Sequence, residues 1–214
     1  MKLYDMQMAP NPRRVRIFLA EKGLNDVEMI PIDLMAGDNL TEDFLKINPR
    51  GTIPTMELDD GSHLDETVAI CRYLEETYPQ PNLMGNDALS KAKIEACQRH
   101  VEFDGFQPLL DAFRNTFPDF SERGVPGLPA EYKAIPKLAE RGQRRYMLFM
   151  QNLNDRLANQ KYIAGEAFSI ADITALCGID FAKLLKIELP EEYTHARRWY
   201  DDVSSRPSAS AYES

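Results

Sequence analysis

Cysteine is scarce in this chain of 214 residues. Only Cys71, Cys97 and Cys177 occur, far apart and without a C-x-x-C pattern. Structural zinc sites and disulfide-rich scaffolds need grouped cysteines, so both are excluded, and we expect three reduced, mostly buried thiols. The three histidines are isolated as well, and no His pair or serine-hydrolase motif indicates metal or triad chemistry.

Long apolar runs and an excess of basic charge are also missing. No uncharged stretch approaches the ~18 apolar residues of a membrane span, and residues 1–15 lack the apolar core of a secretory signal. We therefore expect a cytoplasmic protein with no membrane partner. Lys and Arg total 25 against 34 Asp and Glu, a net charge of −9. A surface of that sign repels phosphate backbones, so no nucleic-acid partner is expected.

The composition that remains is that of a globular protein, with 43% hydrophobic and 28% charged residues. The length suits one large domain or two small ones. Acidic charge is concentrated near the start, because residues 1–80 carry 15 acidic and 8 basic side chains. This asymmetry indicates two regions of different chemistry.

The first 78 residues alternate strand-like and helical patterns. Asn11 is a favoured N-cap and Pro12 suits a first helical position, so a helix is predicted that ends before Gly23. Asp-Gly between two apolar runs predicts a hairpin. The expected order is strand 2–6, helix 11–22, strand 27–34, a short helix capped by Thr41, strands 53–58 and 62–64, and helix 67–78.

A proline-rich stretch at 79–87 is predicted to be a linker between a domain of residues 1–78 and a domain of residues 88–214. Beyond it only helical periodicity is found, which predicts an all-α second domain. Long helices are expected over 88–117 and 135–157, joined by a loop that contains Pro129. Ser169 and Asp172 have the spacing of a capping box, which predicts the start of another helix and a structural role.

Four segments carry a family resemblance: RVRIFLAEKG at 14–23, NPRGTIP at 48–54, ETVAI at 66–70 and GEAFSIAD at 165–172. In this order they resemble the successive motifs of cytosolic glutathione transferases, over nearly the whole chain. The resemblance implies an α/β plus all-α fold, with a thioredoxin-like N-terminal domain followed by an all-helical C-terminal domain. It also implies a homodimer and glutathione as the cosubstrate, with no metal.

Glutathione is an extended anionic tripeptide, so its site must pair with peptide groups. In the family, the residue before a cis-proline does this for the cysteinyl unit, which implies Thr52, Ile53 and Pro54 as binding residues. Without the resemblance, an ordinary trans-proline at the start of a strand is the better interpretation.

Glu66 and Thr67 match the family's acidic and hydroxyl pair before the third helix. A helix N-terminus offers unpaired N–H groups and positive potential, so the resemblance places the γ-glutamyl carboxylate on Thr67. Glu66 would then hold the ammonium group or orient the loop. The alternative is that Asp65, Glu66 and Thr67 only cap and charge-match the helix.

Thiol activation departs from the family pattern. Alignment of the 14–23 segment puts Ala9 where many members have serine, and no hydroxyl or thiol lies between Met6 and Arg14. The chain thus resembles an atypical yeast and bacterial subgroup. We predict Asn11 as the catalytic residue, donating to the sulfur directly or through water, with the N–H groups of Arg13 and Arg14 and the helix dipole assisting. Alternatively, Asn11 is only an N-cap.

An aromatic stripe is predicted on the first long helix of the second domain. Phe103, Phe106 and Phe113 recur at helical spacing together with Leu110 and Phe117. Such a stripe is typical of a core, and in the family the same helix also lines the electrophile pocket. Asp104, off the stripe, is a candidate for the glutathione amine.

Together these features predict a glutathione S-transferase that stabilises the glutathione thiolate and transfers it to a hydrophobic electrophile. Two alternatives stay open. One is a catalytically silent binding or regulatory protein with this fold, which Ala9 favours. The other is a different glutathione-dependent reaction: a peroxidase, etherase, isomerase or dehalogenase. Because no cysteine stands at the active position, a reaction that passes through a mixed disulfide between the protein and glutathione is disfavoured.

Overall fold

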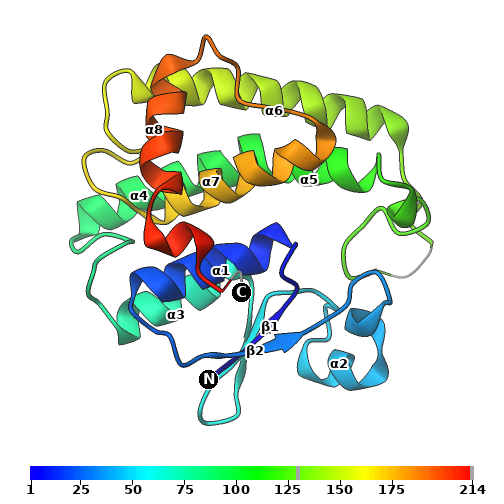
Figure 1. Ribbon diagram of the computed structural model, residues 1–214. Helices are drawn as coiled ribbons and strands as arrows, with labels where there is room; N and C mark the ends of the chain where they lie inside the picture. Colours follow the sequence, from blue (N-terminus) through cyan, green and yellow to red (C-terminus); the bar gives the residue numbers. More distant parts are fainter. Residues whose placement is uncertain (129–130, 213–214) are drawn as a thin grey trace.

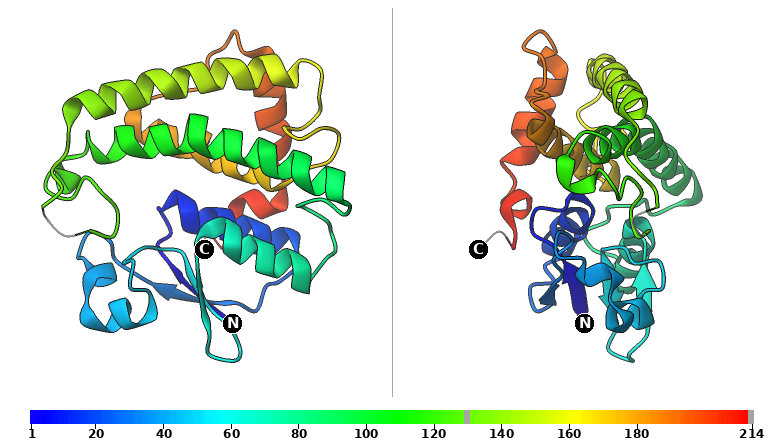
Figure 2. Two further views of the ribbon diagram at one scale, coloured as in Figure 1. Left: turned by 180° about the vertical axis from the view of Figure 1, so that it is seen from behind. Right: turned by 90° about the vertical axis from the view of Figure 1, so that its right-hand side faces the viewer.

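The computed structural model describes residues 1–128 and 131–212 (Figure 1). Pro129 of the predicted loop and the last two residues of the predicted helical region lie outside the described residues. A small sheet lies under helices α1 and α3, and the longer helices of the second half cover these two on their other side, as both views of Figure 2 show. No helix in the described ranges is long and apolar enough to cross a membrane.

The sheet has four strands in the order β2-β1-β3-β4. Their bounds are β1 Lys2–Asp5, β2 Glu28–Pro31, β3 Thr55–Glu57 and β4 His63–Asp65. β1 is parallel to β2 and antiparallel to β3, so Leu3 lies between Met29 and Met56. The predicted strands 27–34 and 53–58 are too long. Pro54 lacks the N–H group that would extend the ladder at the start of β3, whereas one further bond follows Pro31, from Ile32 N to Asp5 O at 2.7 Å.

Helices α1 Pro10–Glu21, α2 Glu42–Ile47 and α3 Thr67–Thr77 complete the first half. Thr41 caps α2 as expected, since its hydroxyl accepts a hydrogen bond from Phe44 N at 3.3 Å. The predicted N-cap of α1 is wrong: Ala9, in extended conformation, is the N-cap, and the helix begins at Pro10. Pro10 and Pro12 both lie in the first turn, where a missing N–H costs nothing.

The second half is helical, and a Tyr162–Gly165 bridge is its one β contact in the described part. The predicted helix 88–117 forms a rod of three segments, because a π-helical turn interrupts the α-helix. The rod ends at Arg114, earlier than expected. Gly105 in that turn lets Phe149 approach, because a Cβ there would lie 2.6 Å from the ring. The segments of the rod are α4 Ala88–His100, the π-turn Val101–Phe106 and α5 Gln107–Arg114. Three more helices follow: α6 Pro136–Leu157, α7 Ile170–Ala182 and α8 Thr194–Ser204. Short 3₁₀ turns lie at Asp38–Leu40, Pro118–Phe120, Lys183–Leu185 and Pro207–Ser210.

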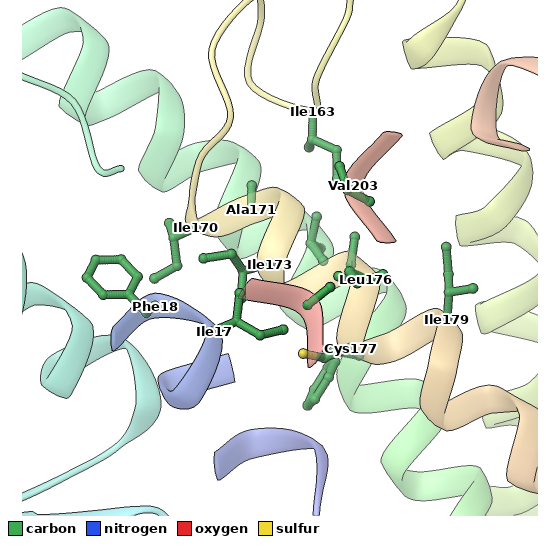
Figure 3. Packing of buried hydrophobic residues seen from close by; sticks show 14 of the residues in the cluster. Ile17, Phe18, Ile163, Ile170, Ala171, Ile173, Leu176, Cys177, Ile179 and Val203 are labelled. Atoms are coloured by element: carbon green, nitrogen blue, oxygen red, sulfur yellow. The ribbon is translucent and has the colours of Figure 1, made fainter. Parts of the chain in front are cut away.

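Helix α7 is the centre of the hydrophobic core. All but one of its residues are buried. Figure 3 shows Ile17 and Phe18 of α1 beside Ile170 and Ile173 of α7, which joins the two halves through one continuous core. The three cysteines are free and buried, as predicted.

The capping box at the start of α7 is part of a larger network. Asp172 is fully buried and accepts hydrogen bonds from Ser169 N at 3.0 Å, Ile163 N at 2.9 Å and Trp199 Nε1 at 2.8 Å. Burial raises the pKa of Asp172 to about 6, against the opposing effect of these donors. The carboxylate therefore ties the start of α7 to the preceding loop and to α8, which is a structural role.

Candidate active site

A polar cavity of about 800 Å³ lies between the sheet half and the rod of α4, π-turn and α5. It brings together segments that are far apart in the sequence. Eight of the nine predicted site residues line it: Asn11, Thr52, Ile53, Pro54, Glu66, Thr67, Phe103 and Phe106. Phe113 lines a neighbouring cavity instead.

The N-terminus of α3 opens into the polar cavity. The first bond of this helix runs from Ile70 N to Glu66 O at 3.0 Å, so the N–H groups of Thr67, Val68 and Ala69 have no partner within the helix. All three residues line the cavity, and Thr67 is only 5% exposed. Three free donors at a helix N-terminus form an anion site.

The side chain of Glu66 does not cap this helix. Its backbone is left-handed, with φ at 64°, and its carboxylate lies 3.3 Å from Arg50 Nη2 at the cavity rim. The alternative in which this side chain caps α3 is therefore wrong. A carboxylate at the rim, beside a free helix N-terminus, suits a ligand end that carries both an amine and a carboxylate.

The turn before β3 presents free peptide groups to the same cavity. The Ile53–Pro54 bond is cis, as the resemblance implied. Asn48 holds the turn, because its Nδ2 donates to Thr52 O at 2.9 Å and to Thr55 Oγ1 at 3.0 Å. In the described part of the chain, the N–H and C=O groups of Ile53 have no hydrogen-bond partner. They are available to a peptide-like ligand.

Asn11 is the donor at the N-terminus of α1. Pro10 and Pro12 have no N–H, and Arg13 N donates to Ala9 O at 3.3 Å. Arg14 N is paired within the helix, so the predicted role of the Arg13 and Arg14 N–H groups is wrong. The free backbone donor of this turn is Asn11 N–H.

The side chain of Asn11 is oriented by Arg14. Arg14 Nη1 donates to Asn11 Oδ1 at 3.0 Å, which leaves the Nδ2 amide as a donor. Arg14 itself is 3% exposed and is held by Thr174 of α7 and by an ion pair with Glu102 of the π-turn. The orientation of Asn11 thus depends on both halves of the molecule.

An apolar cavity of about 360 Å³ adjoins the polar one. The two share part of their lining, namely Asn11, Thr52, Ile53, Leu110 and Pro126. The ring of Phe113 lies 4.3 Å from that of Phe117 and 4.6 Å from that of Phe181, centroid to centroid. A group held at Asn11 therefore faces an aromatic pocket on one side and the polar cavity on the other.

The predicted aromatic stripe is divided between the two cavities. Phe106 is buried at the polar cavity and Phe113 lines the apolar one, while Phe103 is 59% exposed at the rim of the polar cavity. Asp104 lines neither cavity and lies 3.5 Å from Arg145, so its predicted role is not supported.

Comparison with known proteins identifies the family of this chain. The glutathione S-transferase N-terminal domain matches residues 9–77, and the C-terminal domain of that family matches residues 117–207. Glutathione S-transferase 2 of Saccharomyces cerevisiae is 34% identical over 209 residues, which cover 97% of this chain and 87% of the yeast protein. The chain belongs to the glutathione S-transferase family. The predicted family and fold class are thereby confirmed.

Solved transferase structures agree with this assignment. Gtt2 from Saccharomyces cerevisiae superposes with a TM-score of 0.89 at 32% identity, covering 97% of this chain and 98% of the yeast chain. A glutathione S-transferase of class Gtt2 from Vibrio parahaemolyticus gives a TM-score of 0.81 at 37% identity, covering 97% and 94%.

The roles of two side chains beside this site were not found from the sequence. Arg14 and Glu102 are 88 positions apart, and no local pattern relates them. The one available signal was a cluster of three arginines at positions 13, 14 and 16, at the start of a helix with an apolar face. An arginine that is almost fully buried needs a nearby partner.

Proposed function

We propose that this protein is a glutathione transferase whose bound thiol is activated by Asn11. The observation that carries the proposal is the position of Asn11 at the junction of the two cavities, with an anion site on one side and an aromatic pocket on the other. The proposal includes the predicted division at residues 79–87, a cytoplasmic location and a homodimer.

In this proposal, each end of glutathione meets a group of matching chemistry. The γ-glutamyl carboxylate binds the N–H groups at the start of α3 and the Thr67 hydroxyl, and the cysteinyl unit pairs with the peptide groups of Ile53. The thiol then lies near the Asn11 amide and N–H. These donors favour the thiolate over the thiol, which lowers its pKa from about 8.5.

The reaction itself takes place at the junction of the cavities. The thiolate sulfur forms a bond to an electrophilic carbon held in the apolar cavity, and the leaving group departs with its bonding electron pair. Peroxidase, etherase, isomerase and dehalogenase reactions begin from the same thiolate. A silent binding protein is the second candidate, because Ala9 stands where many family members have serine.

Millimolar glutathione is expected to raise the melting temperature. A ligand at 100 times its Kd stabilises the fold by about 2.7 kcal/mol, which is several degrees for a chain of this length. Thermal melting with and without glutathione measures this, followed by conjugation of a chloronitrobenzene. A shift without turnover favours the silent protein, and the absence of any shift contradicts glutathione binding.

Replacing Thr67 by valine is expected to weaken glutathione binding about tenfold or more. The change keeps the shape and the backbone N–H but removes a hydroxyl that would donate to a carboxylate. Titration calorimetry measures the Kd. The matched control is Thr77→Val, the same substitution at the exposed end of the same helix, where the hydroxyl donates to Tyr73 O. Equal affinities for the two variants would show that the Thr67 hydroxyl does not bind glutathione.

A further inference from the structure

Arg114, the last residue of α5, brings a positive charge to the apolar cavity. Its Nη1 donates to Arg123 O at 3.0 Å, and its guanidinium carbon lies 4.5 Å from the centroid of the Phe120 ring. Within residues 1–128 and 131–212, no carboxylate oxygen forms an ion pair with it, and its Nε and Nη2 have no hydrogen-bond partner. Most of the guanidinium's donors are therefore free.

The surroundings of Arg114 do not neutralise this charge. Arg123 is a second arginine without a carboxylate partner in the described ranges, and it is held by Leu34 O at 3.3 Å and Met35 O at 3.4 Å. Asp119 lines the same cavity but forms no ion pair with either arginine. Burial and the charge of Arg123 lower the pKa of Arg114 to about 10, so it stays protonated at neutral pH.

A cation in apolar surroundings is destabilised unless an anion accompanies it. Here the aromatic walls leave room for one, because Phe113, Phe117 and Phe181 line the same cavity of about 360 Å³ as Arg114. A planar guanidinium binds carboxylates through two parallel hydrogen bonds. The missing partner is thus supplied by whatever occupies the cavity.

We propose that Arg114 selects electrophiles that carry a carboxylate on an aromatic ring, at the end opposite the reacting carbon. This inference rests on the proposed function and adds a substrate class to it. The ring packs against the phenylalanines, the carboxylate pairs with Arg114, and the reacting carbon points to the junction at Asn11. In conjugation of a chloroarene, sulfur bonds to the ring carbon and chloride leaves with the bonding pair, while the carboxylate is unchanged.

The test compares two electrophiles of similar shape, 4-chloro-3-nitrobenzoate and its neutral methyl ester, each relative to its uncatalysed reaction with glutathione. Arg114→Gln is expected to lower the carboxylate-to-ester ratio of kcat/KM about tenfold or more, mainly through KM for the carboxylate. Arg114→Lys should retain part of the ratio. The control is Arg141→Gln, which removes one positive charge from an exposed site on α6 outside both cavities, and should leave the ratio unchanged.

The outcomes separate the two proposals. This inference is overturned if Arg114→Gln and Arg141→Gln change the ratio equally, or if Arg114→Gln slows the conjugation of both electrophiles alike. Either result would show that Arg114 does not bind the carboxylate. The transferase function stands in that case, because the ester is still conjugated. If the unaltered protein conjugates neither compound and glutathione does not raise its melting temperature, the proposed function fails and this inference fails with it.

Discussion

Replacing Asn11 by alanine is expected to lower kcat/KM for glutathione conjugation about 10- to 100-fold at neutral pH. A hydrogen bond to a charged acceptor contributes about 1.5–3 kcal/mol, and the Asn11 amide is a side-chain donor at the junction of the cavities. Without it, the pKa of the bound thiol should return toward about 8.5. The pH dependence of kcat/KM measures this directly, since the activity lost at pH 7 should be partly regained above about pH 9, where the thiol ionises without help.

Stability provides the control for this variant. Because Ala9 is the N-cap of α1, loss of the Asn11 side chain removes no cap, and the free energy of unfolding should fall by only about 1 kcal/mol, for the lost hydrogen bond from Arg14 Nη1. Asn11→Gln keeps an amide and should recover part of the activity. A variant with an unchanged pH profile would show that the Asn11 side chain does not act on the thiol, which would leave the Asn11 N–H and the helix dipole to stabilise the thiolate.

Replacing Asp172 by alanine is expected to destabilise the fold by about 4 kcal/mol. The change leaves four buried donors without this acceptor, namely Ile163 N, Ser169 N, Ser169 Oγ and Trp199 Nε1. Each buried, unsatisfied donor costs about 1–3 kcal/mol, and a cavity adds to the loss. Urea unfolding followed by circular dichroism gives the difference.

Asp201→Ala is the matched control for Asp172, because Asp201 is an exposed aspartate on α8. It should change the free energy of unfolding by less than about 0.5 kcal/mol. Asp172→Asn keeps one acceptor oxygen and should fall between the two, so the comparison remains possible if the alanine variant does not fold. A loss below about 1 kcal/mol for Asp172→Ala would show that water replaces the carboxylate.

The first half of the chain is acidic, although the ligand proposed for it is an anion. Residues 1–80 carry nearly twice as many acidic as basic side chains, yet the proposed ligand of this half is an anion. The N-terminus of α3 and the peptide groups of Ile53 supply the attraction. Net charge acts at long range and is screened by salt, whereas helix N-termini act over a few ångströms on a bound group.

Interactions between near neighbours were determined by the sequence alone. The cap of α2 at Thr41 and the Ser169–Asp172 box depend on residues three positions apart, so their patterns are readable directly. The order of strands and helices and the family motifs followed in the same way. Through those motifs, the sequence by itself assigned Ile53, Pro54, Glu66 and Thr67 to one site.

The tertiary structure alone decided the features that depend on distant residues. Arg14 meets Glu102, and a π-turn divides the aromatic stripe between two cavities. Ala9 becomes the cap of α1, and Arg114 reaches an apolar cavity without a carboxylate ion pair in the described part of the chain. The physical reason is the same each time: burial and pairing energies depend on which surfaces meet, and local propensity carries no information about a partner many positions away.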